Sequence, residues 1–235
     1  MKRIVLSSLV VLGLSISSAQ AASLTVSTAV GGAPTGVALD NLNWLTLGSG
    51  GGTNGQVTVT FNPDAGAVQG AISGQYAAPV YSNFNGAAFG DAYNGVDQST
   101  YISSGSNGGS HPGASAEIAF SSHQKYFGLL WGSVDNYNTL SFYDGTTLLG
   151  SVTGAQASLV APTGDQGPLG TYYVNITSDT AFNRVVATSS QYAFEFDNIS
   201  YNPTIPFEKA VPEPSTVVLL GAALAGVARR VRRRA

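Results

Sequence analysis

Apolar and polar residues alternate along much of the chain, in short runs separated by glycine-rich segments. Residues 56–61 place Val57, Val59 and Phe61 on one face and polar side chains on the other, and residues 114–120 alternate in the same way. A period of two is typical of strands that bury one face. The pattern therefore predicts a series of short strands and no long interior helix.

The stretch from Tyr126 to Trp131 is almost continuously apolar, which predicts a central strand covered on both faces, with Trp131 in the core. Asp144-Gly145 separates two alternating runs and is a strong signal for a tight hairpin. Further strands are predicted at 171–176, 184–188 and 192–196, and loops at 48–55 and 103–113. The expected fold is all-β, an antiparallel β-sandwich of the jelly-roll type.

The composition supports this fold and excludes several functions. The chain has 235 residues with 29 Gly and 10 Pro, but only 10% charged residues and no Cys, so disulfides and thiolate metal sites are excluded. Between Ser23 and Ala210 there are three basic and twelve acidic residues, a formal charge of −9. Without a basic cluster, this region is a poor partner for nucleic acid.

The N-terminus has the features of a secretory signal peptide. Lys2 and Arg3 precede an apolar stretch from Ile4 to Ile16, and Ala19-Gln20-Ala21 offers the small residues that signal peptidase recognises. The alternative, an N-terminal membrane anchor, needs about 20 apolar residues. We therefore expect a helical signal peptide over residues 1–22 and a β-sandwich domain over 23–207.

The C-terminus, residues 208–235, combines a proline motif, a short apolar stretch and a basic end. The motif is Val211-Pro212-Glu213-Pro214-Ser215, and twelve small or apolar residues follow at 217–228. As a helix they would reach only about 18 Å, short of a hydrocarbon layer about 30 Å thick. The segment that stays in the cytoplasm and stops transfer across the membrane would be the basic cluster Arg229, Arg230, Arg232, Arg233 and Arg234. The short transmembrane helix suits a sorting signal better than the alternative, a plain membrane anchor.

This tail resembles the PEP-CTERM sorting domain of Gram-negative bacteria. The resemblance implies recognition by an exosortase in the inner membrane, removal of the tail, and delivery to the cell surface or extracellular matrix in organisms that make exopolysaccharide. Two internal stretches, residues 126–145 and 194–199, and more weakly Tyr101, resemble a family of exosortase-dependent surface proteins. That second resemblance implies location and no particular activity.

Candidate catalytic residues are few. His111 and His123 lie in polar segments without a recognisable nucleophile motif, so surface positions are expected. Glycoside hydrolysis needs two facing carboxyl groups, and Glu117 and Glu195 are the obvious pair because both are expected to point away from the apolar strand faces. An outward Glu on a strand is usually only solvated. We therefore expect a protein that is not an enzyme.

Calcium and saccharide are the candidate ligands. Asp40-Asn41, Asp135-Asn136 and Asp197-Asn198 offer hard oxygen ligands, and Asp40 with Asp197 is the preferred pair for a structural calcium ion. The alternative is that these pairs only form Asx turns. Aromatic residues in loop-like segments could stack on sugar rings or pack in the core. They are Trp44 and Tyr93, followed by Tyr81, Phe84 and Tyr101.

The sequence thus predicts an exported, exosortase-processed surface or matrix protein that is not an enzyme and associates with exopolysaccharide. Its partners would be signal peptidase, an exosortase and the polysaccharide, with transient membrane association through the C-terminal helix. One alternative is a lectin-like jelly-roll module with a defined saccharide pocket. The other is a polysaccharide hydrolase that uses carboxyl groups.

Overall fold

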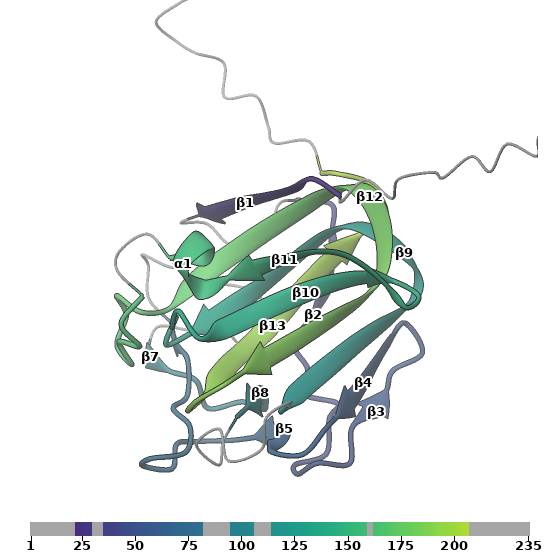
Figure 1. The fold of residues 1–235 in the computed structure, drawn as a ribbon. Helices are drawn as coiled ribbons and strands as arrows, with labels where there is room; N and C mark the ends of the chain where they lie inside the picture. The colour runs from purple at the N-terminus through teal and green to yellow at the C-terminus, as the bar shows by residue number, and fades with distance from the viewer. Residues whose placement is uncertain (1–21, 30–34, 82–94, 106–113, 159–161, 207–235) are drawn as a thin grey trace, which may run out of the picture.

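Two antiparallel strands of 18 residues each, β9 (Ser115–Gly132) and β12 (Tyr172–Ser189), run through the centre of the fold (Figure 1). The computed structural model describes residues 22–29, 35–81, 95–105, 114–158 and 162–206. β9 and β12 pair with each other over most of their length, and the register shifts on either side of Phe182. These shifts divide the pair into two halves with different neighbours.

The first sheet contains the early half of β9 and the late half of β12. Its order is β11 (Thr147–Thr153), β10 (Asn138–Asp144), β12, β9, β4 (Val57–Phe61) and β3 (Gly52–Thr53). The second sheet contains the other two halves, in the order β1 (Leu24–Ala29), β12, β9 and β13 (Phe194–Asn202). β13 also pairs with β2 (Ala38–Asp40) and β8 (Tyr101–Ser104), and β8 pairs with β5 (Ala65–Val68). All pairings among the described residues are antiparallel.

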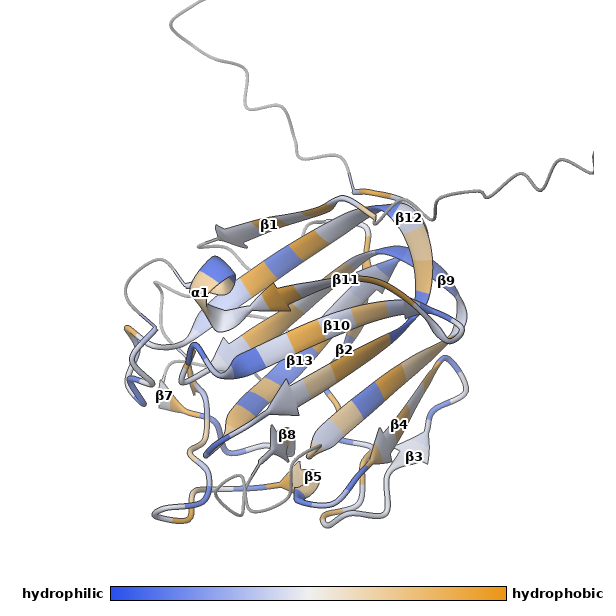
Figure 2. Ribbon diagram, viewed as in Figure 1, coloured by the Kyte–Doolittle hydropathy of each residue, from blue (hydrophilic) through white to orange (hydrophobic). Residues whose placement is uncertain are grey.

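Aromatic rings from both sheets meet between the two layers. Phe127 in the second sheet lies 6.2 Å from Phe142 in the first, measured between ring centroids, and Phe142 lies 5.1 Å from Phe182. Trp131 is fully buried and stacks on Phe194 at 4.4 Å, as its apolar surroundings predict. Figure 2 shows apolar and polar residues alternating along these strands. The prediction of an all-β antiparallel sandwich is confirmed, and most neighbouring strands are distant in sequence, as in jelly rolls.

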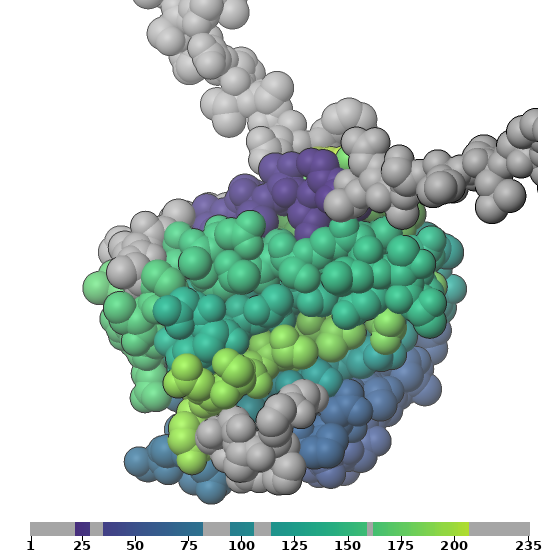
Figure 3. All heavy atoms as spheres, viewed as in Figure 1, coloured from purple at the N-terminus to yellow at the C-terminus, as the bar shows by residue number. Residues whose placement is uncertain are grey.

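β1 closes one side of the sandwich. It pairs with β12 in the second sheet, while the backbone amide of Ala22 donates to the carbonyl of Leu149 in β11 at 3.1 Å. Gly150 leaves room for Leu24, because a Cβ there would lie 3.0 Å from the leucine side chain. Figure 3 shows β1 lying against the hairpin formed by β10 and β11. The only helix among the described residues, α1 (Gly154–Ala157), follows β11.

Local predictions are mostly confirmed. β4 buries Val57 and Val59 and exposes the threonine that follows each of them, and β10 and β11 form the predicted hairpin with Gly145 at φ 56°. The structure differs at residues 121–125, where a polar stretch predicts a break but β9 continues. These residues cross the edge of the sandwich between the two sheets, where polar side chains reach solvent without interrupting the strand.

The outer face of the second sheet is polar and yet buried. Register places Glu195 opposite Gly132 and Ser200 opposite Gly128, on the face away from the core. Both side chains are buried, as is Asp197. A Cβ at Gly132 would lie 3.1 Å from Pro79, so the segment that ends in β6 (Val80–Tyr81) lies directly over this face. β6 pairs with β7 (Gly95–Val96), which completes the described part of this covering layer.

The first described strand begins, and the last one ends, in one row of the second sheet. Thr25 pairs with Thr177, Thr177 with Tyr126, and Tyr126 with Asn202, so four neighbouring strands are aligned there. Glu195 and its partner Gly132 lie at the opposite end of the same strands. One end of the second sheet therefore lies where the described chain begins and ends, and the opposite end is formed by loops.

The predicted signal helix and C-terminal helix lie outside the described residues, except for Ala22. Within the part of the chain that the structure describes, no helix has the length and apolar character required to cross a membrane.

Candidate ligand-binding pocket

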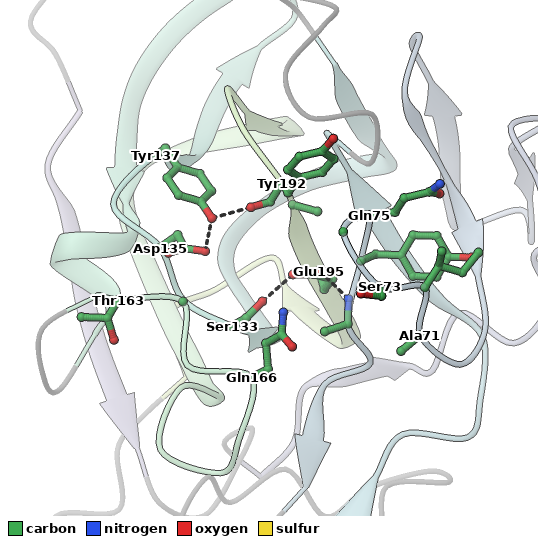
Figure 4. Close-up of a pocket in the computed structure, with 16 residues that line it drawn as sticks. Ala71, Ser73, Gln75, Ser133, Asp135, Tyr137, Thr163, Gln166, Tyr192 and Glu195 are labelled. Carbon is green, nitrogen blue, oxygen red and sulfur yellow. Dashed lines mark hydrogen bonds between the residues drawn. The ribbon is translucent and has the colours of Figure 1, made fainter.

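A pocket of about 430 Å³ opens at the loop end of the second sheet (Figure 4). Four segments line it: the turn at 71–77, the connection between β9 and β10, the loop around 163–166, and residues 192–195. Ile72 and Tyr76 close the turn through reciprocal backbone hydrogen bonds of 3.0 and 3.1 Å. The hydroxyl of Tyr101 donates to the carbonyl of Gly70 at 2.5 Å and holds the start of this turn.

Glu195 lies at the base of the pocket. The backbone amide of Ala77 donates to Oε1 at 2.8 Å, and the hydroxyl of Ser133 donates to Oε2 at 2.6 Å. Only 2% of the residue is exposed. Burial raises the pKa of this carboxyl to about 7, although both hydrogen bonds act to lower it. The expectation of a solvated Glu195 is therefore wrong, because the 71–77 turn covers the outer face of β13.

Asp135 forms a second buried acidic group in the same pocket. Tyr137 donates its hydroxyl to Oδ2 of Asp135 and also contacts the carbonyl of Tyr192. Burial raises the pKa of Asp135, and the hydrogen bond from Tyr137 partly offsets that rise. Gly164 has φ +68°, and a Cβ there would lie 2.5 Å from Oδ1 of Asp135. Only glycine lets the backbone approach this carboxylate so closely.

The two acidic groups influence each other and the phenol beside them. The charge of Asp135 contributes to the raised pKa of Glu195, after the larger effect of burial. Burial, Asp135 and Glu195 all raise the pKa of Tyr137, so its hydroxyl stays protonated and can donate. At neutral pH the pocket thus combines carboxyl groups with hydroxyl and amide groups and with the rings of Tyr76, Tyr137 and Tyr192.

The structure does not bring the predicted carboxyl pair together. Glu117 lies in the first sheet, opposite Val186 and Thr60, and pairs with Arg184 at 2.8 Å. Glu195 shares its pocket with Asp135 instead. In the sequence, Asp135 is a candidate only as part of an Asp-Asn pair. Alternation along strands does not predict where the side chain of a residue in a connection will lie.

The predicted saccharide-binding residues lie elsewhere. Trp44 is half-buried against the core, and its Nε1 donates to Asp40 at 2.9 Å, outside the pocket. Tyr93 lies outside the described residues, as do Phe84 and His111. Tyr101 is buried, and His123 is exposed beside Asp144 at 2.9 Å, as expected for a surface histidine. Tyr192, with 48% of its surface exposed, is the most accessible aromatic residue of the pocket.

The two residues of the predicted calcium pair have different surroundings. Asp40 accepts hydrogen bonds from the amide of Leu42 at 2.9 Å, from Trp44, and from Asn54 at 2.7 Å, so its turn is an Asx turn. Asp197 is fully buried on β13, and the hydroxyl of Tyr81 contacts both Asp197, at 2.9 Å, and Asp97, at 3.2 Å. No group of three or more His, Cys, Asp or Glu able to hold a metal ion is found among the described residues. Calcium binding stays a prediction.

Comparisons with known proteins identify the tail and leave the pocket unassigned. The body is an antiparallel β-sandwich with a polar pocket at one end, and residues 210–234 match the PEP-CTERM protein-sorting motif. The chain therefore carries a PEP-CTERM sorting domain, which implies export, processing by an exosortase and targeting to the cell surface. The predicted sorting residues, Val211 to Ser215 and the five arginines from Arg229, fall inside this match and outside the described structure.

No curated protein matches the chain. Two solved structures of the catalytic domain of a GH87 alpha-1,3-glucanase, in complex with tetrasaccharides, resemble it weakly. Their sequence identities are 14% and 16%, and their TM-scores are 0.34 and 0.31. Each match covers 71% of this chain and 31% of the other, so the chain spans about a third of the length of these structures.

Proposed function

We propose that this protein is an exported, exosortase-processed component of the cell surface or extracellular matrix that binds exopolysaccharide through the pocket at the loop end of the second sheet. Binding does not involve catalysis. The observation that carries the proposal is the pocket itself, which combines tyrosine rings with buried hydrogen-bonding groups in a space of about 430 Å³.

Saccharides suit such a site for two reasons. Their rings present flat apolar faces that stack on aromatic side chains, and their hydroxyls both donate and accept hydrogen bonds. Tyr76, Tyr137 and Tyr192 supply rings, while Gln75 and Gln166 supply amide groups. A tail that delivers the chain to the cell surface favours a ligand that is found there.

The bonding of Glu195 supports binding over catalysis. Its two oxygens hold the turn at Ala77 and the connection at Ser133, so the carboxyl group fixes two walls of the pocket. A hydrolase stays the second candidate because one observation favours it. A carboxyl group with a pKa of about 7 beside a second acid is a common arrangement for a general acid.

The test uses the mature protein recovered from the producing cells, mixed with purified exopolysaccharide and sedimented. We expect retention, and we expect Tyr192→Ala to weaken it about tenfold, the effect of losing about 1.4 kcal/mol of ring stacking. Leu148→Ala is the matched control, because Leu148 is 54% exposed on β11 and outside the pocket. Equal retention of Tyr192→Ala would refute the assignment of the pocket. Reducing ends released by the normal protein and not by Glu195→Gln would establish the hydrolase instead.

A further inference from the structure

Among the described residues, acidic groups carry all the formal charge of the pocket. Glu195 and Asp135 line it, and the described lining residues include no lysine, arginine or histidine. The two strongly basic residues of the described body are held elsewhere. Lys125 donates to the carbonyl of Asp179 at 2.9 Å, and Arg184 pairs with Glu117.

The titratable groups that face Glu195 are acidic or phenolic. Asp135 and Tyr137 approach from the connection between β9 and β10, Tyr76 from the turn, and Tyr101 from β8. None of these side chains gains a positive charge at any pH. The described protein therefore supplies hydrogen bonds to the two carboxyl groups and no cation.

Two neighbouring buried carboxyl groups without a cation are costly to ionise. Burial raises the pKa of both groups, the charge of Asp135 adds to the rise at Glu195, and a positively charged ligand would offset much of this cost. A sugar hydroxyl can only add a hydrogen bond, and a uronate would bring a third negative charge into the same space. Ammonium groups can donate to Glu195 and Asp135 together, because each carboxylate oxygen accepts more than one hydrogen bond.

The tyrosine rings favour the same ligand. Tyr76, Tyr137 and Tyr192 line the same pocket as the acidic groups, and the face of an aromatic ring attracts a cation within about 6 Å. The ring that stacks on the apolar face of a sugar thus also favours an ammonium substituent on that sugar.

We propose that the pocket selects saccharide units with a protonated amino group, hexosamines that lack the N-acetyl group, over neutral and anionic units. The proposal rests on the saccharide-binding function proposed above and names the class of sugar. The ammonium group lies between the carboxyl groups of Glu195 and Asp135, while Tyr192 covers the sugar ring from the open side of the pocket.

The test measures the affinity of the mature protein, by calorimetry at pH 6.5, for four oligosaccharides of equal length. They are a β-1,4-linked glucosamine oligomer, its fully N-acetylated form, a glucose oligomer and a galacturonate oligomer. We expect the glucosamine oligomer to bind at least tenfold more tightly than the N-acetylated form, and the galacturonate oligomer to bind most weakly. The preference should shrink as sodium chloride is raised, since it is electrostatic.

Variants link this preference to the two acids. Asp135→Asn and Glu195→Gln should each reduce the ratio of the glucosamine to N-acetylglucosamine affinities several-fold, while Asp144→Asn, an exposed acid outside the pocket, should not. Melting curves identify a variant that fails to fold. In that case the affinity ratio of the other variant tests the preference. Equal affinities for the glucosamine, N-acetylated and glucose oligomers would overturn the amine preference and leave saccharide binding intact. Tightest binding of galacturonate would overturn the preference outright, and no binding of any oligomer would refute both proposals.

Discussion

Glu195 is buried among hydrogen-bond donors and still has a pKa near neutrality, so its protonation couples to folding. In the unfolded chain the carboxyl ionises near its ordinary pKa of 4.5, and in the native state it ionises near 7. Between these values the native state holds more protons, and the free energy of unfolding falls as pH rises. Below 4.5 this contribution is fully present, and above 7 it is lost.

We therefore predict that Glu195→Gln flattens the pH dependence of stability. Urea unfolding at pH 4.5 to 8 should show the normal protein losing on the order of 3 kcal/mol more than the variant over this range. Asp135, whose pKa is raised by burial, contributes in the same direction in both proteins, so the difference between the two curves reports Glu195 together with its coupling to Asp135. Parallel curves of unfolding free energy against pH for the two proteins would contradict a buried Glu195 carboxyl with a raised pKa.

Calcium binding can be tested at the two predicted residues separately. A cation at Asp197 would neutralise two buried carboxyl groups, because Tyr81 contacts both Asp197 and Asp97. We expect EDTA to lower the Tm, excess calcium to restore it, and Asp197→Asn to abolish the response. Asp40→Asn should lower the Tm equally in EDTA and calcium if its role is only to accept from Leu42, Trp44 and Asn54. An unchanged Tm of the normal protein in EDTA and then in calcium would exclude a structural calcium ion.

At the scale of elements, Phe182 lies where the register of β12 shifts between the two sheets. Its ring is fully buried and meets Phe120 at 6.2 Å and Phe142 at 5.1 Å. We predict that Phe182→Ala costs about 3 to 5 kcal/mol, the usual effect of emptying a buried phenylalanine site. Chemical unfolding measures it, and Leu148→Ala on the exposed surface of β11 should cost under about 1 kcal/mol. A loss below 1 kcal/mol for Phe182→Ala would contradict this packing.

Strands β4, β10 and β11 could be predicted because alternation and the Asp-Gly turn are local signals, whereas β1, β5 and β8 were not predicted. That residues 115–132 form one strand could not be predicted, because the polar stretch at 121–125 is equally consistent with a turn and with a strand that crosses an exposed edge. Which strands become neighbours depends on the same non-local contacts. The sequence therefore predicted the strands with the clearest alternation and left the short strands, and the order of strands in each sheet, open.

The pocket was less predictable than the fold. Alternation correctly placed Glu195 on the outer face of its strand, but the covering turn at 71–77 has no strand or helix pattern, and it makes that face an interior one. Tyr192 and Asp135 lie in connections, where periodicity carries no information. Pockets built from loops depend on contacts between residues more than 100 positions apart, such as Ala77 and Glu195.

At the scale of the whole molecule, the sorting motif determines where the protein is delivered. We predict that replacing Pro212, Glu213 and Pro214 with alanine prevents processing, so that the basic end stays attached and the protein stays with the membrane fraction. Cell fractionation and mass spectrometry of the C-terminus measure both effects. Pro203→Ala, at an exposed residue before the motif, is the control and should be processed normally. Normal surface delivery of the triple variant would contradict exosortase recognition of this motif.

The alignment of Thr25, Thr177, Tyr126 and Asn202 at one end of the second sheet has a consequence for a tethered molecule. β13 runs from Glu195 to Asn202, and the seven steps between these eight residues span roughly 23 Å. An anchor attached beyond Pro206 therefore holds the sandwich by the end remote from the pocket. Removal of the tail therefore leaves the residues that line the pocket unchanged, since none of the described lining residues lies beyond Glu195.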